Sequence, residues 1–158
     1  MATVRTAGTE IIRSAHFEDV NNSPNNDLIV GVQHHIYTVL SIIVYFNAVG
    51  GSTAPDKACT ISLLGYDSYA GTTGQNMNIV NSQGRSAGDT FVWNDKFSFN
   101  GCEPADFTGP MGDATKQDAI ADQDPSNGSP VAQKLQIWSG NASTLLDVHI
   151  TYIDQNNA

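Results

Sequence analysis

One long segment of the chain, residues 37–49, is dominated by apolar side chains and ends at the Gly50–Gly51 pair. Its content of Val, Ile, Tyr and Phe favours a β-strand over a helix. It is too short, and too often interrupted by polar residues, to span a membrane. In an extended chain, alternate residues fall on two faces: Tyr37, Val39, Ser41, Ile43 and Tyr45 on one, and Thr38, Leu40, Ile42, Val44 and Phe46 on the other. Because both faces are largely apolar, we expect a central strand that is covered on both sides.

Shorter segments before and after it also have strand character. Residues 28–36 form one of these, with His34 and His35 inside it. Residues 58–64 alternate, with Cys59, Ile61 and Leu63 on an apolar side and threonine and serine opposite. Further short strands are expected over residues 76–80, 90–93, 96–99 and 134–138.

The last strand is expected over residues 145–153. Its apolar face carries Leu146, Val148, Ile150 and Tyr152, and its polar face carries Asp147, His149 and Thr151, with Asp154 at the polar end. About eight short strands separated by turns predict an all-β protein, an antiparallel β-sandwich of jelly-roll type. We assign residues 27–158 to this domain, and residues 1–26 to an N-terminal arm or edge segment with a short edge strand at residues 11–12.

Residues 101–130 form a long acidic loop interrupted by four prolines. A short helix is expected inside it over residues 114–121, with Asp113 as its N-cap. The stretch that begins at Asp122 resembles a calcium-binding loop, but its glycine comes one position late and Gln133 stands where a bidentate acid is needed. We therefore interpret this stretch as a solvated acidic loop.

The formal net charge of −9 and the sequence pI of about 4.5 change the list of candidate partners. A nucleic-acid-binding protein normally carries a basic patch, and docking on anionic lipid also requires basic residues. We therefore expect neither nucleic acid nor a membrane as a partner. No apolar segment of the secretory type follows the N-terminus, so synthesis in a cytoplasm is expected.

The sequence contains no recognisable catalytic constellation. It has no Gly-x-Ser-x-Gly elbow, no glycine-rich phosphate loop and no His-x-x-x-His pair. His16 and His149 have no neighbouring ligands in the sequence, and His34 and His35 would point to opposite faces of a strand. Five aspartates stand at expected turns, where aspartate bonds to the local backbone: Asp67, Asp89, Asp95, Asp113 and Asp124. We expect no catalytic, cofactor-binding or metal-binding residues, and no enzyme activity.

Two groups of residues leave alternatives open. The first group consists of aromatic residues that share one parity: Phe91, Trp93, Phe97 and Phe99. They could pack in the core or form an exposed aromatic strip. The segment that carries them could be a tight hairpin or a single bulged strand. Cys59 fits a buried apolar thiol, and a bridge to Cys102 is the alternative.

Three segments carry a resemblance to a known class of proteins: Asp-Thr-Phe-Val-Trp-Asn-Asp-Lys-Phe-Ser-Phe (residues 89–99), Lys-Leu-Gln-Ile-Trp (134–138) and Leu-Leu-Asp-Val-His-Ile-Thr-Tyr-Ile-Asp (145–154). In these segments the chain resembles small virion structural proteins of tailed bacteriophages, including capsid decoration (cement) proteins. The acidic insertion at residues 101–130 departs from their compact pattern. No residue-level function transfers, because such proteins have no catalytic residues.

The resemblance implies a non-enzymatic protein on the capsid exterior of a virion. It would bind the major capsid protein, stabilise the shell and associate as a homotrimer, which also hides exposed sheet edges. A phage tail or fibre component is one alternative. A carbohydrate-binding β-sandwich module that uses Trp93 or Trp138 as a stacking platform is another.

Overall fold

The computed structural model describes residues 8–22, 26–67, 72–104 and 130–156, and these residues form an all-β fold. Every strand pairing among them is antiparallel, and their only helical element is the 3₁₀ turn η1 (Pro55–Lys57). The expected all-β, antiparallel class is confirmed. The strands are β1 (Thr9–Val20), β2 (Asn26–Val30), β3 (His35–Ala48), β4 (Cys59–Asp67), β5 (Thr72–Ser82), β6 (Thr90–Trp93), β7 (Phe97–Asn100), β8 (Cys102–Pro104), β9 (Pro130–Ala132), β10 (Lys134–Ser139) and β11 (Leu145–Asn156).

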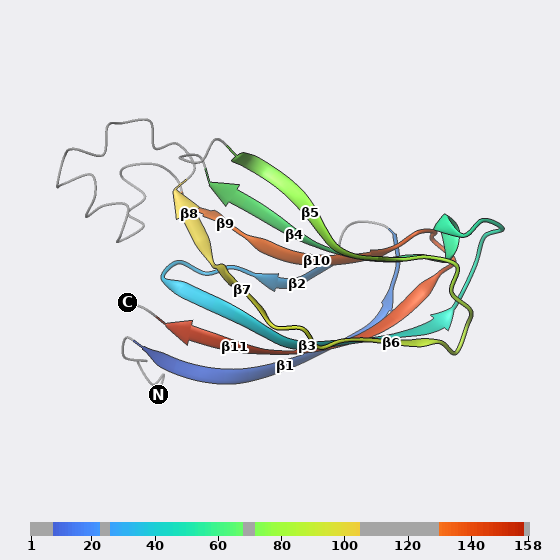
Figure 1. Ribbon diagram of the computed structural model, residues 1–158, viewed down its shortest axis with the longest axis horizontal. Coiled ribbons are helices and arrows are strands. Elements are labelled where there is room, and N and C mark those ends of the chain that lie inside the picture. Colours follow the sequence, from blue (N-terminus) through green and yellow to red (C-terminus); the bar gives the residue numbers. More distant parts are fainter. Residues whose placement is uncertain (1–7, 23–25, 68–71, 105–129, 157–158) are drawn as a thin grey trace.

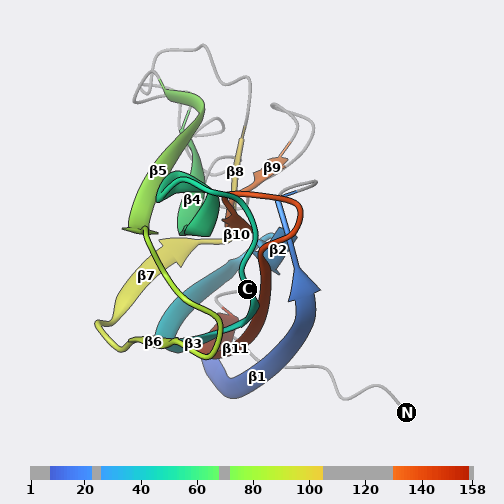
Figure 2. The same cartoon turned by 90° about the vertical axis from the view of Figure 1, so that its right-hand side faces the viewer.

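Two sheets pack face to face as a sandwich (Figures 1 and 2). The first, which we call sheet A, has the strand order β1-β11-β3-β6, and β7 also pairs with β3. The second, sheet B, has the order β2-β10-β4-β5. The chain changes sheet at β1–β2, β2–β3, β3–β4, β5–β6 and β10–β11. This strand order is compatible with a jelly roll.

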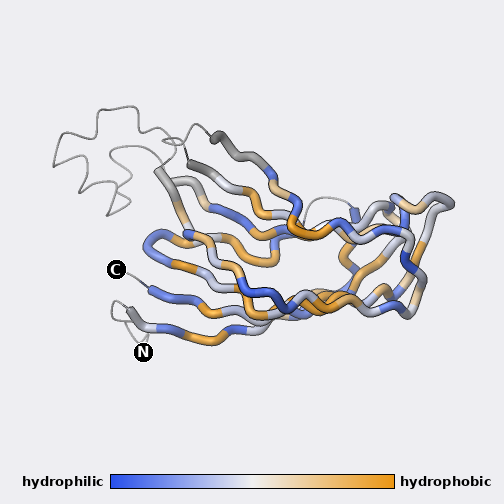
Figure 3. The backbone as a smooth tube through the Cα atoms, viewed as in Figure 1, coloured by the Kyte–Doolittle hydropathy of each residue, from blue (hydrophilic) through white to orange (hydrophobic). Residues whose placement is uncertain are grey.

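The core lies between the two sheets and is built from their inward-facing side chains, with hydrophobic residues along the strands of both layers (Figure 3). Seven of the larger buried side chains are completely inaccessible to solvent: Phe46, Ile42, Ile61, Leu135, Ile137, Leu146 and Ile150. They come from β3 and β11 in sheet A and from β4 and β10 in sheet B. The period-2 alternation of β4, β10 and β11, and of β3 from Ile42 onward, therefore specifies the inner faces of the sandwich.

Strand β3 is the centre of sheet A, as expected, but its two faces differ from the expected sets. Its pairing with β11 shifts register between the Thr151–Ser41 and Tyr152–Val39 pairs, which leaves Leu40 as an extra residue. A bulge of this kind moves all following side chains to the opposite face. The core face is therefore Tyr37, Val39, Ile42, Val44 and Phe46.

The expectation that β3 is covered on both sides is wrong for the single chain. Beyond the bulge, Ile43 and Tyr45 point away from sheet B and remain exposed. Only the face that carries Tyr37, Val39, Ile42, Val44 and Phe46 packs against the second sheet.

The aromatic segment forms one edge of sheet A as an interrupted strand. Both β6 and β7 run antiparallel to β3, with Trp93 opposite Ile42 and Phe97 opposite Val39. Of the two alternatives, this is the bulged single strand, and its break lies opposite the bulge of β3. Phe99 is buried, and Phe91, Trp93 and Phe97 pack against the core, so the four aromatics do not form an exposed strip.

Three other expectations need correction. The strand expected over residues 28–36 is broken by a turn, because β2 ends at Val30 and His34 has a φ of 64°. The edge strand expected at residues 11–12 is the twelve-residue β1, which pairs with β11 along its length. Asp154 shares the parity of Tyr152 and faces inward, where it is 3% exposed.

The described ends of the acidic loop are held together by the short ribbon of β8 and β9. Next to this ribbon, the backbones of Gly31, Gly101 and Gln133 meet. Gly31 N donates to Gln133 O at 2.8 Å, and Gln133 N donates to Gly101 O at 3.0 Å. The helix expected over residues 114–121, and the calcium-like stretch up to Gly128, lie outside the described residues.

Candidate interaction surfaces

The outer face of sheet A, which is the side turned away from sheet B, carries an exposed apolar patch. Ile43, Tyr45 and Val92 form it, and their exposed fractions are 38%, 41% and 53%. Val92 is the direct cross-strand partner of Ile43, so the patch continues from β3 to the edge strand β6. We call these three residues the outer patch. Contiguous exposed apolar residues are a common mark of protein interaction sites.

Carboxylates border the outer patch on the side of β11 and β1. Asp147 stands directly opposite Tyr45, and it accepts a hydrogen bond of 3.2 Å from the backbone N–H of Asp19. Asp19 has a φ of 54° at a register shift of β1 and lies 3.4 Å from the amide nitrogen of Asn47. The apolar surface is therefore flanked by negative charge, which favours a partner with basic groups.

His16 and His149 face each other on the same outer face, with ring centroids 6.1 Å apart. Glu18 Oε1 lies 3.7 Å from His16 Nε2. Within the described part of the chain, no three His, Cys, Asp or Glu side chains are placed so that they could hold a metal ion. His34 lies in the turn before β3 and His35 lies at the start of β3.

A buried carboxylate connects three strands of sheet A at one end of the sandwich. Asp154 of β11 accepts a hydrogen bond of 2.8 Å from Arg13 Nε of β1 and lies 2.6 Å from His35 Nδ1 of β3. The Asp154 side chain is 5% exposed, while Arg13 and His35 are 47% and 20% exposed. A carboxylate buried this deeply requires such partners, so we interpret the cluster as a clamp across the three strands.

Tyr37 lies beside this cluster, stacked on Phe99 with ring centroids 5.5 Å apart. Burial, and secondarily the negative charge of Asp154, raise the pKa of Tyr37 to about 12. A folded-state pKa above the ordinary value of 10 means that the native state holds the proton more tightly. The corresponding stability is complete below pH 10 and is lost as the pH rises towards 12.

We therefore expect Tyr37→Phe to flatten the fall in the free energy of unfolding between about pH 10 and pH 12, measured by urea unfolding. The fall is reduced and not abolished, because burial also raises the pKa of Tyr152. Tyr45→Phe is the control, since it leaves Tyr37 in place. A wild-type slope in the Tyr37→Phe variant would contradict the assignment.

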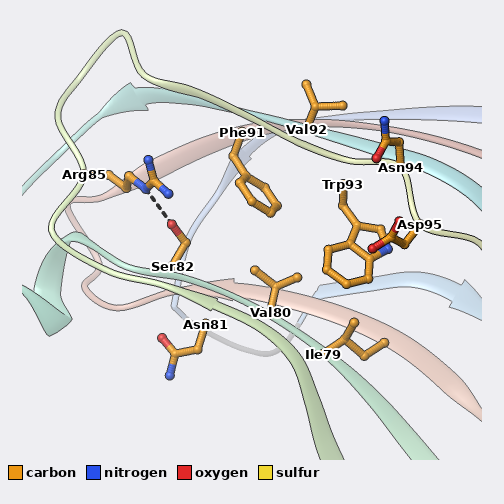
Figure 4. Close-up of a pocket in the computed structure, with 10 residues that line it drawn as sticks. All are labelled: Ile79, Val80, Asn81, Ser82, Arg85, Phe91, Val92, Trp93, Asn94 and Asp95. Atoms are coloured by element: carbon orange, nitrogen blue, oxygen red, sulfur yellow. Dashed lines mark hydrogen bonds between the residues drawn. The ribbon is translucent and has the colours of Figure 1, made fainter.

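A pocket of about 390 Å³ opens on the side of the sandwich, between β5 of sheet B and β6 of sheet A (Figure 4). Among the described residues, β5 pairs only with β4 and β6 only with β3, so both strands are sheet edges. Phe91 and Trp93 line it from β6, and Ile79 and Val80 line it from β5. Arg85 and Asp95 add charged groups.

The two tryptophans that could serve as stacking platforms lie in different places. Trp93 lines the pocket, whereas Trp138 lies on β10 opposite Thr60. Both are partly buried. Within the described residues, the indole N–H of Trp93 is buried and has no hydrogen-bond partner. Sequence reasoning identified Trp93 as a candidate but missed Arg85 and the pocket, because the approach of β5 and β6 depends on the sheet order.

Cys59 and Cys102 are both buried, and no disulfide bond joins them. Burial raises the pKa of the Cys59 thiol to about 12, which makes it unreactive at neutral pH.

Among the described residues, we find no helix with the length and apolar character needed to span a membrane.

No protein-family model and no curated protein matches this chain. Among solved structures, it is similar to a chain of Bacillus endospore appendages, which are disulfide-linked pili, with 8% identity and a TM-score of 0.41, over 100% of this chain and 97% of that chain. It is also similar to chains of infectious bursal disease virus strains Gt and Gx, with 7% identity to each and TM-scores of 0.37 and 0.32. This chain covers only 33% and 40% of those two viral chains. TM-scores of this size carry no argument about function.

Proposed function

We propose that this chain is a non-enzymatic structural protein that joins a larger protein assembly through the outer face of sheet A. The observation that carries the proposal is the outer patch, Ile43, Tyr45 and Val92, which the single chain leaves in solvent. The same central strand places its other apolar face in the core. A partner that covers the outer patch would bury apolar area at a gain of about 25 cal/mol per Å².

Within this class, we propose a virion decoration protein that binds the major capsid protein on the capsid exterior. The proposal rests on the resemblance of residues 89–99, 134–138 and 145–154 to small phage structural proteins. In the fold, these segments comprise β6 and most of each of β7, β10 and β11. A tail or fibre component would use the same surface in another part of the particle.

Charge supplies a second support for binding between different proteins. The chain has a formal net charge of −9, and Asp147 and Asp19 border the outer patch. Lysine or arginine on the partner would complement this border, and the association rate would fall as salt is added. Homotrimer formation, which is part of the same proposal, must overcome repulsion between like-charged subunits and is therefore expected to improve with salt.

The test is the attachment of the purified chain to the particle that carries it, followed by cryo-electron microscopy. We expect density between neighbouring shell subunits, with the outer face of sheet A in contact. The double variant Ile43→Ser/Val92→Ser should weaken the affinity for the particle roughly tenfold or more, which corresponds to a loss of at least about 1.4 kcal/mol of binding free energy and lowers the occupancy. Met77→Ser is the matched control, because Met77 is an exposed apolar residue of sheet B with 61% exposure.

Three results would contradict parts of this proposal. Equal occupancy of the double variant and the control would exclude the outer patch as the contact. Density confined to the tail would replace the decoration role with the tail or fibre alternative. Light scattering coupled to size exclusion that returns a monomer at micromolar concentration and at high salt would remove the trimer.

A further inference from the structure

The side pocket between β5 and β6 has no role in the proposed structural function, and its lining points to a ligand. Its middle is apolar, with Phe91 above Val80 in the view of Figure 4. Arg85 stands at one end of the pocket, and Trp93, Asn94 and Asp95 stand at the other. An apolar wall with a few polar groups at its ends is the usual composition of a small-molecule site, and about 390 Å³ lies within the usual range of about 300–1,000 Å³.

At one end of the pocket Arg85 is held by neighbouring structure, and at the other end the indole N–H of Trp93 lacks a partner among the described residues. Arg85 Nε donates to Ser82 Oγ at 2.5 Å, and Arg85 N donates to Lys57 O at 3.1 Å, which hold the residue in place. The N–H of Trp93 is buried without a partner among the described residues. An orphaned buried donor carries a cost in free energy, because it has lost its hydrogen bond to water without gaining another. A ligand oxygen that reached this donor after a small movement of the ring would recover part of that cost.

The chemistry that fits these groups is a ring with apolar C–H faces and hydroxyl groups at its rim. An indole or phenyl face packs against an apolar ring face. Hydroxyl groups both donate and accept, so they can donate to the Asp95 carboxylate and accept from the Arg85 guanidinium and the Trp93 N–H. These are the properties of a hexose. A polyanionic sugar fits less well, because Asp95 stands in the pocket and the whole chain has a net charge of −9.

We propose that the side pocket is a binding site for a neutral saccharide, one or two hexose units long. Trp93 and Phe91 supply the apolar wall, Arg85 donates to ring or hydroxyl oxygens, and Asp95 and Asn94 accept from hydroxyl groups. The two proposed sites share one residue, because Val92 of the outer patch also lines the pocket, whereas Ile43 and Tyr45 do not. The saccharide proposal does not rest on the structural function, since the groups that it assigns to the ligand all lie outside the outer patch.

The test is a nitrogen-15 NMR titration of the full chain with four neutral disaccharides: maltose, cellobiose, lactose and chitobiose. The chain has two tryptophans and therefore two indole N–H signals. We expect at least one disaccharide to move the Trp93 signal in a saturable way at millimolar concentration, while the Trp138 signal stays in place. Arg85→Gln and Asp95→Asn should each weaken this binding roughly tenfold.

Lys96→Gln is the matched control, since Lys96 is exposed and adjacent to Asp95 but does not line the pocket. The folded state of each variant is checked by its backbone amide spectrum. No movement of the Trp93 signal with any of the four sugars would overturn the proposal. Movement of the Trp138 signal alone, binding that persists in both pocket variants, or tighter binding of an acidic oligogalacturonide would overturn it as well.

Discussion

Replacement of Gly31 by alanine is expected to lower the free energy of unfolding by about 3 kcal/mol. A Cβ on Gly31 would overlap the backbone carbonyl of Gly101. This carbonyl cannot rotate away like a side chain, because it accepts the hydrogen bond from Gln133 N. Relief therefore requires separation of the turn after β2 from the segment between β7 and β8. Urea unfolding followed by circular dichroism measures the loss.

Gly65→Ala is the control for this prediction. Gly65 lies in β4, and an added Cβ there would meet only Gln133 Oε1 at an ordinary contact distance of 3.6 Å. Alanine also reduces the conformational entropy of the unfolded chain, which favours the folded state. We therefore expect the free energy of unfolding to change by less than about 1 kcal/mol, or to rise slightly. If both variants lose the same stability, the close approach of Gly31 to Gly101 is not the cause.

Asp154→Asn is expected to cost about 2–3 kcal/mol, because it leaves Arg13 and His35 without their shared carboxylate. An asparagine side chain has the same shape but no charge. It replaces the charge-assisted bond to Arg13 with a neutral one, and its NH₂ group fits His35 Nδ1 only when that nitrogen carries no proton, at a site with 5% exposure. Chemical unfolding at pH 7 measures this loss.

Asp27 provides a close comparison on sheet B. It also accepts from two side chains, Lys134 Nζ at 2.9 Å and Gln136 Nε2 at 2.7 Å. Its side chain is 29% exposed, so solvent can replace the lost interactions. We expect Asp27→Asn to cost about 1 kcal/mol or less. Equal losses of stability at Asp27 and Asp154 would show that burial does not determine how much the Asp154 cluster contributes to the free energy of unfolding.

Much of the fold could be predicted from alternation alone, since β4, β10 and β11 keep a strict period of two along their core faces. The faces of β3 could not, because the bulge at Leu40 changes the parity of the strand. Such a bulge is defined by the register with β11 and with the β6–β7 edge, and neither register is visible in the local sequence.

The candidate surfaces were only partly predictable for the same reason. Trp93 stood out as an aromatic residue, but Ile79 and Arg85, which line the same pocket, come from β5 and the loop after it, across the edge of the sandwich. Asp154 stands two residues after Tyr152 and therefore lies on the same face of the strand, which predicts its burial. An acidic residue at the end of a strand is more often solvated, and this general tendency led to the wrong face.

The pairing of β1 with β11 has a consequence for how the molecule assembles during synthesis. These strands come from opposite ends of the described chain, and Gly8 N donates to Asn156 O where they finish. Strand β3 likewise has no partner on one of its sides until β11 has been synthesised. Sheet A thus cannot close until residues 145–156 have left the ribosome, so native structure should appear slowly and only after β11 has emerged, as in other topologies of high contact order.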